Sequence, residues 1–470
     1  MTLSDTLRKI VGDAHVLTEF DMDKYARDWT GEYVCKPIAV VRPASTQEVS
    51  NVVKACATTN TPIVPVSGNT GLCGGTHAEG AVMISVERLN QIREIRPDAR
   101  IALVDAGVIL DQLRGAADDE DLVFPLSFGA RGSAMIGGVL STNAGGSNVV
   151  KYGSTRALCL GVEVVLADGQ IMDLMSELHK DNSGYDLKNL MIGAEGTLGI
   201  ITGAVLKLFP KPKAYASATV AVPKLDQALG LLNELQAVTG GMVEAFEYMP
   251  RNYVARHVHL GLGAEPFAEA YETNILVEVG STAPRDADVT DEGAIPIVEY
   301  LQAVLVKMME RGEVLDAVVA QNEAQRMEMW KRREDAAEVV LTLRPLQNND
   351  VCLPVDRVST FLDKMKDRLK THDADCIEML VSHLGDGNVH YSLHPSSDDP
   401  QLKSQLMEAV EDVVLELGGS FSAEHGIGLS KLPSMERRKD RVALQVMRAI
   451  KGALDPNGIM NPGKVLPDMD

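Results

Sequence analysis

The sequence has few aromatic residues and no long hydrophobic run. Aromatic side chains make up 4% of its 470 residues. No window holds the roughly 18 consecutive apolar residues of a membrane-spanning helix. The first residues also lack an apolar core after a basic start and a small-residue cleavage site. We therefore expect neither a transmembrane helix nor a secretory leader.

Cysteine and positive charge are also scarce. No two of the six cysteines form a CxxC pair, a pattern that favours reduced thiols over a disulfide framework. Lysine and arginine number 45 against 66 aspartates and glutamates, which gives a net charge of −21 at pH 7. Such a surface repels phosphate backbones and anionic lipids. We therefore expect a cytoplasmic protein that binds no nucleic acid.

The remaining composition predicts a globular protein with two α+β regions. Hydrophobic residues are 45% and charged residues 24% of the total, which is ordinary globular usage. Between residues 36 and 210, short β-rich runs alternate with helical stretches at Thr46–Thr59 and Leu110–Asp118. Two prolines in Phe209–Lys213 predict a domain boundary. Beyond it, strands alternate with longer helices, and Arg441–Leu454 predicts an amphipathic helix.

Glycine-rich loops take the place of the common nucleotide motifs. The chain has no GxGxxG after a strand and no P-loop, which disfavours both of those folds. Instead, PVSGNTGLCGGT at residues 65–76 places four glycines between Gly68 and Gly75. Their unshielded N–H groups suit a nest around a pyrophosphate. For this segment alone, a purely structural turn is an equal alternative.

Two further loops favour the ligand-binding interpretation. Residues 125–146 include nine glycines or serines, small enough to line a planar ring, and Ser141, Thr142 and Asn143 offer hydrogen bonds. The loop at residues 193–202 passes from glycines into a strand. Three such loops in one region point to a bound cofactor.

The order of these loops resembles the FAD-binding domain of the vanillyl-alcohol oxidase superfamily. The motifs are PVSGNTGLCGG, GSAMIGGVLSTNAGG, KYGSTRALCLGVEVVLADG and GAEGTLGIIT. The resemblance implies that the first loop holds the FAD pyrophosphate, the second runs along the isoalloxazine and the third borders the nucleotide. Asn69 stands where relatives with covalent flavin carry a histidine, so the resemblance implies non-covalent FAD.

The same resemblance implies a set of FAD-binding residues. They are Pro65, Ser67, Gly68, Asn69, Thr70, Gly71, Gly74, Gly75, Pro125, Gly132, Ser133, Gly137, Gly138, Ser141, Thr142, Asn143, Gly145, Gly146, Glu195, Gly196, Gly199, Ile200, Ile201 and Asn461. Arg131, Lys151 and Arg156 are either phosphate partners or solvated charges at loop ends.

A histidine pair lies across a glycine turn in the second region. Two apolar runs flank GDGN at residues 385–388, so the segment predicts a hairpin that brings His383 and His390 side by side. Glu424 and His425 follow in SAEHGIG. Two histidines and a carboxylate form the ligand set of a catalytic zinc or related divalent ion. His383, His390 and Glu424 are the candidate ligands, and His425 is left as a base.

HLGDGNVH, SAEHGIG and the closing LDPNGIMNPGK together resemble the FAD-dependent D-2-hydroxy-acid dehydrogenases. This group includes D-lactate and D-2-hydroxyglutarate dehydrogenases and the flavin subunit of glycolate oxidase. The resemblance implies the same metal ligands, His425 as the base, and Arg333, which follows Trp330, as the holder of the substrate carboxylate. Taken alone, Arg333 would be a charge on a helix surface.

The resemblance also implies an α+β architecture with three parts. An FAD-binding domain covers residues 1–212, with an N-terminal helix and two α+β subdomains. A substrate (cap) domain with an antiparallel sheet covers residues 213–424, and a helical segment at residues 425–470 packs back on the FAD domain. The implied electron acceptor is an electron-transfer flavoprotein, a quinone or a cytochrome, which would place the protein beside the inner membrane. We expect a homodimer by default.

The identity of the substrate stays open between two acids. D-2-hydroxyglutarate dehydrogenases usually carry a lysine and a threonine where this chain has Asn348 and Ala337. The missing lysine removes a partner for a distal carboxylate, although Arg344 could supply a distal cation. The runs LRP at residues 343–345 and DVCLP at residues 350–354 resemble the D-lactate dehydrogenases more closely. A flavin subunit of a larger complex and a metallohydrolase remain alternatives. His257 and His259 alternate as on a strand, and we expect them to be structural or surface residues.

Overall fold

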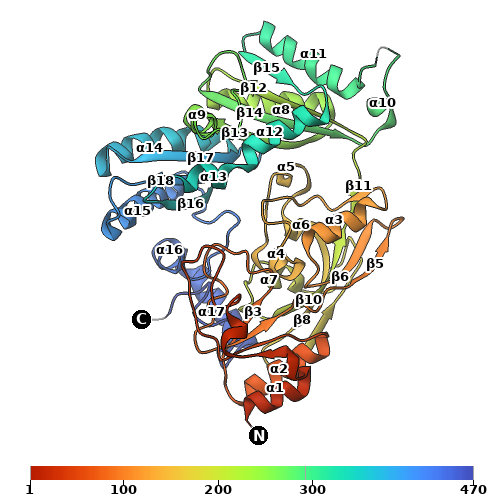
Figure 1. The fold of residues 1–470 in the computed structure, drawn as a ribbon, viewed down its shortest axis with the longest axis vertical. Coiled ribbons are helices and arrows are strands. Elements are labelled where there is room, and N and C mark those ends of the chain that lie inside the picture. Colours follow the sequence, from red (N-terminus) through yellow and green to blue (C-terminus); the bar gives the residue numbers. More distant parts are fainter. Residues whose placement is uncertain (1, 292, 469–470) are drawn as a thin grey trace. The chain divides into compact units, whose positions relative to one another are not determined.

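The computed structural model describes residues 2–291 and 293–468, which divide into two compact units (Figure 1). Unit 1 comprises residues 1–145, 153–210 and 424–470, and unit 2 comprises residues 146–152 and 211–423. The short insertion at residues 146–152 carries α5 (Val149–Tyr152), which packs on a strand of unit 2. The chain therefore leaves unit 1 directly after the second glycine loop.

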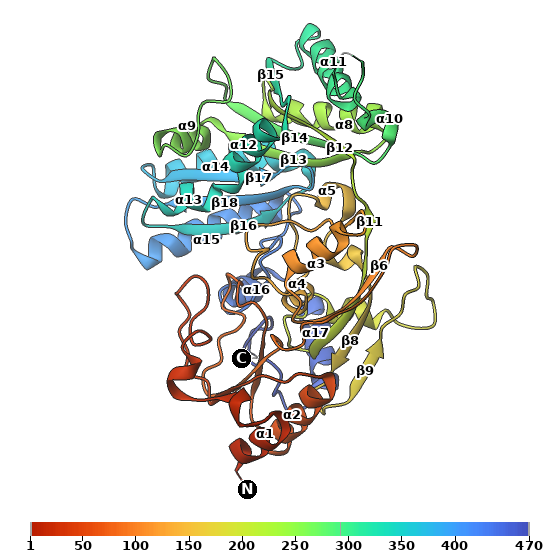
Figure 2. The ribbon, with the colours of Figure 1, turned by 45° about the vertical axis from the view of Figure 1, so that its right-hand side comes forward.

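The N-terminal part of unit 1 is a four-stranded sheet with two helices. The strand order is β1 (Val16–Leu17), β2 (Ala39–Val41), β4 (Val82–Ser85) and β3 (Ile63–Val66), and β4 runs parallel to both β2 and β3. The helices α1 (Leu3–Val11) and α2 (Thr46–Thr58) lie side by side (Figure 2). The Ser45 side chain caps α2 by accepting a hydrogen bond from the Glu48 N–H.

The second part of unit 1 is a five-stranded antiparallel sheet. Its order is β5 (Ile92–Arg96), β6 (Ile101–Asp105), β10 (Ile200–Lys207), β8 (Cys159–Val165) and β9 (Ile171–Leu174). A two-stranded ribbon joins β7 (Leu122–Val123) to β11 (Phe209–Pro210). The helices of this part are α3 (Leu110–Asp118), α4 (Ile136–Thr142), α6 (Thr155–Leu158) and α7 (Leu187–Met191).

The C-terminal segment belongs to unit 1. It contains α16 (Leu432–Arg438) and α17 (Arg441–Leu454), and α17 has the bounds that the sequence predicts. After α17, Met460 forms a parallel bridge with Ile63 on β3. Residues 459–461 therefore lie beside the strand that leads into the first glycine loop.

Unit 2 is built on a seven-stranded antiparallel sheet. Its order is β15 (Asp316–Val319), β12 (Ala214–Ala221), β14 (Thr273–Ser281), β13 (Val243–Pro250), β17 (Ile377–His383), β18 (Asn388–His394) and β16 (Gln347–Cys352). Its helices are α8 (Ala228–Thr239), α9 (Arg251–His259), α10 (Pro284–Ala287), α11 (Pro296–Glu310), α12 (Glu323–Glu334), α13 (Ala336–Leu341), α14 (Val358–His372) and α15 (Pro400–Glu416). Short 3₁₀ helices in the two units cover Asp13–His15, Glu19–Met22, Leu225–Gln227 and Val355–Arg357.

The two faces of this sheet differ in chemistry. Side chains of α8, α11, α14 and α15 form one apolar core with the first face. A smaller apolar cluster joins the second face to α9, α12 and α13. Because successive strand residues point to opposite faces, Glu247 and His383 face the second side, between their apolar neighbours. The second face therefore carries both Glu247 and His383.

The predicted α+β fold class is confirmed, and one local prediction is wrong. His257 and His259 lie on helix α9 and not on a strand. Alternation over three residues is too short to separate the two structures, and Pro250 precedes the helix. His257 is buried and bonds to Asp335 through Nε2, at 2.9 Å. His259 is exposed.

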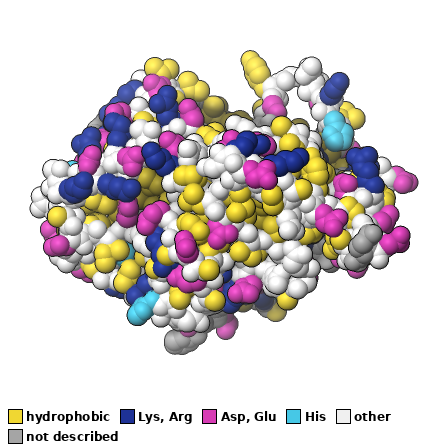
Figure 3. All heavy atoms as spheres, turned by 90° about the horizontal axis from the view of Figure 1, so that it is seen from above, with side chains coloured by type: hydrophobic (Ala, Val, Ile, Leu, Met, Phe, Trp, Pro, Cys, Tyr) yellow, Lys and Arg dark blue, Asp and Glu magenta, His cyan; other side chains and the backbone are white. Residues whose placement is uncertain are grey.

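The surface agrees with the charge balance of the sequence. On the face seen in Figure 3, acidic and basic side chains are interspersed and no basic patch gathers. Within residues 2–291 and 293–468, no helix is long and apolar enough to cross a bilayer. The six cysteines, all of them described, form no disulfide bond.

Glu163→Gln should make the stability of unit 1 less dependent on pH. The Glu163 carboxylate accepts hydrogen bonds from Thr46 at 2.7 Å, Arg93 at 2.9 Å and Thr202 at 3.0 Å. Burial alone would raise the pKa of Glu163, but these donors outweigh it and hold the pKa below the ordinary 4.5. A lowered pKa stabilises the folded state above pH 4.5, and this contribution is lost as pH falls below that value.

The expected loss of unfolding free energy is about 1.5–3 kcal/mol at pH 7, the range for hydrogen bonds to a charged group. The difference from the wild type should shrink as pH falls below 4.5. Urea unfolding at several pH values measures it. A difference that is the same at pH 7 and pH 3 would contradict this account.

Candidate active site

The predicted hairpin is present and places two histidines on one face of the sheet of unit 2. β17 pairs with β18 so that His383 lies opposite Asn388, and Val381 lies opposite His390. The two imidazoles are therefore diagonal neighbours, with ring centroids 5.2 Å apart in an edge-to-face arrangement. At the turn, Gly387 has φ +84°, and a Cβ there would lie 2.0 Å from a backbone oxygen. Only glycine fits this turn.

A fully buried carboxylate organises this face. Glu247 on β13 lies opposite His383 in the neighbouring strand. Its Oε1 is 2.9 Å from His383 Nδ1, and its Oε2 accepts a hydrogen bond from Arg333 Nε at 2.7 Å. Burial opposes ionisation, but His383 and Arg333 outweigh it and hold the pKa of Glu247 below its usual range. An ionised Glu247 can only accept a hydrogen bond, so the neutral His383 ring carries its hydrogen on Nδ1 and its lone pair on Nε2.

Arg333 is not a surface charge, contrary to what its helix alone predicts. It is 7% exposed and lies on the inner face of α12. The same face carries Arg326 and Trp330, which donate to Glu278 on β14 at 2.7 Å from Nε and from Nε1. Spacings of four and three residues place these side chains along one stripe of the helix. Two buried glutamates therefore hold α12 against the sheet.

His390 has its own carboxylate neighbour. It lies opposite Asp350 on β16, and its Nδ1 is 3.8 Å from the Asp350 Oδ1. Asp350 is 3% exposed and accepts a hydrogen bond from Asn388 Nδ2 at 2.9 Å. Sequence reasoning missed both Asp350 and Glu247. For Glu247 the available signal was an acidic residue among the apolar residues of a strand, because a buried charge needs a partner. For Asp350 no such signal existed, because its strand, QNNDVC, is mostly polar.

The donor set on this face fits a divalent metal ion. Metal-binding histidines usually direct one ring nitrogen at a carboxylate, and both His383 and His390 have a carboxylate on the Nδ1 side. Arg333 Nη2 lies 3.3 Å from His383 Nε2. The lone pair of that nitrogen can therefore serve either Arg333 or a metal ion, but not both at once.

The first glycine loop of unit 1 is fixed by the side chain of Asn69, whereas several of its backbone N–H groups make no hydrogen bond within the described protein. Asn69 Nδ2 donates to the Arg27 carbonyl at 2.9 Å, and Asn69 Oδ1 accepts from Thr76 at 2.7 Å. Within the part of the chain that the structure describes, the N–H groups of residues 68–72 donate no hydrogen bond. Such a row of N–H groups suits an anion. The loop therefore fits the pyrophosphate of FAD.

The three glycine loops pack directly on one another. A Cβ at Gly68 would lie 2.1 Å from the Ser133 carbonyl oxygen in the second loop. A Cβ at Gly196 in the third loop would lie 2.3 Å from Pro65 in the first. These two glycines are therefore required by close contact, and not only by a ligand.

The polar side chains of the second loop are largely engaged within the protein. The hydroxyls of Ser141 and Thr142 donate to the carbonyls of residues 137 and 138, at 2.7 and 3.1 Å. Asn143 has φ +50°, and its Oδ1 accepts from Ser154 Oγ and from the Arg156 N–H. The two hydroxyls can thus accept a hydrogen bond from a ligand, but their own hydrogens are already used.

The charged residues near these loops also have protein partners. Lys151 pairs with Glu244 at 2.9 Å, in unit 2. Arg156 donates to the carbonyls of Asn189 and Ile192. Arg131 lies 3.6 Å from a carboxylate oxygen of Asp111. These contacts give each charge a structural role.

Glu424 and His425 lie in a turn of unit 1. His425 Nε2 is 3.8 Å from the Glu424 Oε1. A Cβ at Gly145, the last residue before the chain enters unit 2, would lie 2.6 Å from the Glu424 Oε2. In unit 2, the Ala423 N–H donates to the Asp350 carbonyl, and Glu424 is the next residue along the chain. Both Glu424 and His425 are partly exposed.

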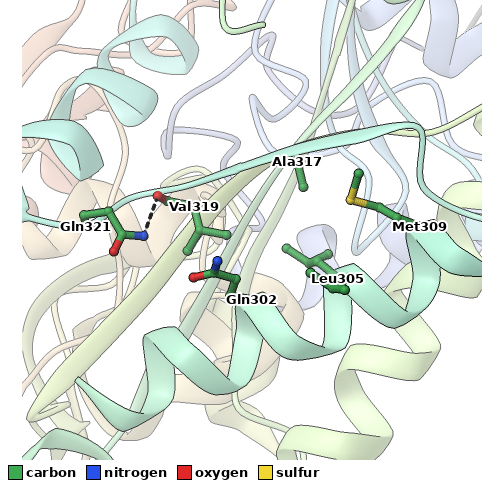
Figure 4. A pocket seen from close by; sticks show the side chains of 7 residues that line it. Gln302, Leu305, Met309, Ala317, Val319 and Gln321 are labelled. Carbon is green, nitrogen blue, oxygen red and sulfur yellow. Dashed lines mark hydrogen bonds between the residues drawn. The ribbon is translucent and has the colours of Figure 1, made fainter. Parts of the chain in front are cut away.

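A cavity elsewhere in unit 2 carries no such chemistry. It has a volume of about 230 Å³ and lies between α11 and β15 (Figure 4). Its lining is apolar apart from Gln302 and Gln321. β15 is at one edge of the sheet, whereas β18 and β16 are at the other edge. We assign it no catalytic role.

Comparison with known proteins identifies two domain families along the chain. Residues 37–175 match an FAD binding domain, and residues 211–465 match the C-terminal domain of FAD linked oxidases. The D-2-hydroxyglutarate dehydrogenase of Stutzerimonas stutzeri is 34% identical, with 98% of both chains covered. The mitochondrial D-2-hydroxyglutarate dehydrogenase of Arabidopsis thaliana is 33% identical, over 98% of this chain and 80% of its own.

Solved structures with the same fold have more distant sequences. Alkyldihydroxyacetonephosphate synthase has a TM-score of 0.73 at 16% identity, covering 98% of this chain and 86% of its own. p-Cresol methylhydroxylase has a TM-score of 0.73 at 17% identity, covering 99% of this chain and 96% of its own. These likenesses confirm the predicted vanillyl-alcohol-oxidase-type fold.

Gly145→Ala should displace the Glu424 carboxylate, because the new Cβ and Glu424 Oε2 cannot both occupy positions 2.6 Å apart. We expect turnover of substrate to fall by roughly 10- to 100-fold, the effect of a misplacement of about 1 Å. Flavin absorbance and steady-state assays measure retained cofactor and activity separately.

Gly115→Ala is the matched control, since Gly115 lies in α3 of the same unit with no atom within 4 Å of an added Cβ. It should leave turnover unchanged. Equal activities of the two variants would argue against the Glu424 contact.

Proposed function

The chain belongs to the FAD-dependent D-2-hydroxy-acid dehydrogenases of the FAD linked oxidase family, and we infer that its substrate is D-2-hydroxyglutarate. The reaction takes a hydride from carbon and a proton from oxygen, and a 2-oxo acid leaves. The observation that carries the proposal is the buried Arg333, held by Glu247 beside His383 on the polar face of unit 2. This is a site for an anion next to acid–base groups.

Arg333 is proposed to bind the carboxylate of the substrate. Its Nε is already held by Glu247 at 2.7 Å, so the edge formed by its two Nη atoms remains for a carboxylate. A two-point contact on that edge fixes the orientation of the acid as well as its position. Because α12 is fastened to the sheet at two points, the guanidinium is preorganised for this contact.

His425 is proposed to remove the hydroxyl proton. A neutral imidazole suits this step, since the ordinary pKa of histidine is close to the working pH. Glu424 precedes it in the same turn. With His383 and His390, Glu424 completes the proposed ligand set for a divalent ion, most simply zinc.

The cofactors supply chemistry that the side chains lack. The glycine loops of unit 1 would hold FAD, which would supply the hydride acceptor. A divalent ion, when bound, supplies Lewis acidity toward the hydroxyl oxygen. The protein binds and orients the acid, excludes water with the buried face of unit 2, and holds the proton on His425.

D-lactate is a second candidate substrate, and Asn348 favours it. This residue lies on β16, on the same face as Asp350, and accepts a hydrogen bond from Ser392 at 2.8 Å. It is an uncharged amide, exposed to solvent. An amide contributes less than a lysine to binding a second, distal carboxylate. Relatives from Stutzerimonas stutzeri, Xanthomonas citri and Arabidopsis thaliana, which are named D-2-hydroxyglutarate dehydrogenase, favour the first candidate.

Electron transfer and assembly remain proposals that rest on the family resemblance. We propose that the electrons pass to an electron-transfer flavoprotein, a quinone or a cytochrome. The protein would then work in the cytoplasm, beside the inner membrane when its acceptor is located there. A homodimer and a flavin subunit of a larger complex are the two assemblies proposed.

Anaerobic addition of D-2-hydroxyglutarate should bleach the flavin absorbance of the purified protein, because hydride transfer to the flavin needs no further electron acceptor. The L-enantiomer should leave the spectrum unchanged. Stopped-flow absorbance with D-2-hydroxyglutarate, D-lactate, D-malate and glycolate ranks the substrates. Faster bleaching by D-lactate would select the second candidate, and a spectrum that none of these acids changes would overturn the proposed reaction.

Removal of the metal should abolish this bleaching, since the hydroxyl proton becomes harder to remove without a Lewis acid. Addition of zinc or manganese should restore it. His390→Ala should lower the bound metal measured by mass spectrometry, whereas His259→Ala, on an exposed part of α9, should not. Equal rates of bleaching before and after chelation would rule out a catalytic metal.

A further inference from the structure

We propose that Glu195 is a positioning residue, whose side chain fixes the turn that carries His425. Its Oε1 accepts a hydrogen bond from the Ile427 N–H at 2.7 Å, and its Oε2 accepts one from the Gly428 N–H at 2.8 Å. All these residues belong to unit 1. The role of His425 as a base rests on the proposed function, whereas the two hydrogen bonds from the turn to Glu195 do not.

The turn is shaped around this carboxylate. Gly426 has φ +78°, and a Cβ there would lie 2.8 Å from the Glu195 Oε1. Gly428 has φ +52°, and a Cβ there would lie 2.1 Å from the Cys73 carbonyl oxygen. The backbone of the turn therefore approaches Glu195 on one side and the first glycine loop on the other. Neither approach is open to a residue larger than glycine.

The carboxylate depends on these two amides. Burial raises the pKa of Glu195, and the Ile427 and Gly428 amides oppose that rise. The positive charges of Lys431 and Lys464 also lower the pKa of Glu195, but less than the two amides do. The Glu195 side chain is partly exposed, and both of its carboxylate oxygens are used by the backbone of the turn.

The backbone of Glu195 ties the turn to the other cofactor loops. Glu195 has φ +51°, its N–H donates to the Ser141 carbonyl at 2.8 Å, and its carbonyl accepts from Asn461 Nδ2 at 2.7 Å. The same Asn461 amide donates to the Gly75 carbonyl at 3.1 Å. One residue thus joins the second loop, the C-terminal segment and the turn of His425. Its position fixes the base relative to the loops proposed to hold the flavin.

The test is Glu195→Gln, studied in the full-length protein with FAD. Glutamine has only one acceptor oxygen, so its NH₂ group would lie against a backbone N–H from which it cannot accept a hydrogen bond. We expect the amides of Ile427 and Gly428 to exchange with deuterium faster than in the wild type. We expect the rate of flavin reduction to fall by roughly 10- to 100-fold, as for a small misplacement of a reacting group. The KM for the acid and the FAD content should change by less than about threefold.

Glu163→Gln is the matched control, because it makes the same substitution at another hydrogen-bonded carboxylate of unit 1. It should leave both the exchange of the turn and the rate of flavin reduction unchanged. If Glu195→Gln does not fold, Gly426→Ala perturbs the same contact from the other side, since its Cβ would meet the Glu195 carboxylate. It should show the same fast exchange and slow reduction.

Three results would overturn the proposal: exchange at Ile427 and Gly428 equal to the wild type, an unchanged rate of flavin reduction, or loss of FAD from Glu195→Gln. The last would make the side chain a cofactor-binding group. A wild-type protein that no D-2-hydroxy acid reduces would contradict the proposed function instead. The exchange measurement needs no substrate, so it still tests whether the Glu195 side chain holds the turn in place.

Discussion

The ion pair of Glu247 with Arg333, completed by His383, is the interaction on which the polar face of unit 2 depends. Each group alone would cost several kcal/mol to bury. Together they meet at 2.7 and 2.9 Å, and a helix and two strands are fixed in one arrangement. Replacing one member leaves the others buried without a partner. The face can therefore hold a positive charge and an imidazole side by side, and we propose that these two groups recognise the 2-hydroxy acid.

Unit 2 repeats this arrangement one strand further along the sheet. Glu278 on β14 accepts hydrogen bonds from Ser217, Arg326 and Trp330, and it is 3% exposed. Buried glutamates on β13 and β14 thus accept hydrogen bonds from the side chains of α12 that face the sheet. The opposite face of the same sheet packs mainly against the apolar sides of α8, α11, α14 and α15. One face of the sheet thus forms the main apolar core, and the other face holds Arg333 in a fixed position.

The sequence was sufficient for the features that depend on neighbours along the chain. The hairpin around Gly385–Asn388, the helix at Arg441–Leu454 and the motifs of the family could all be predicted. Glu247 could not, because its partner His383 is 136 residues away and only strand pairing brings them together. The burial of Arg333 likewise depends on which face of α12 meets the sheet. The hydroxyls of Ser141 and Thr142 were expected to bind a ligand, but the structure directs their hydrogens into α4.

The central claim is that this D-2-hydroxy-acid dehydrogenase binds the carboxylate of its substrate through Arg333. The most direct test compares Arg333→Lys with Arg332→Lys by stopped-flow reduction of the flavin. Both arginines are buried on α12, but Arg332 donates to the Ala264 carbonyl, away from Glu247. The account predicts that Arg333→Lys weakens binding of the D-acid by roughly 10-fold or more, since a lysine makes no two-point contact. Arg332→Lys should bind the acid as the wild type does. Equal binding by all three proteins would contradict the account.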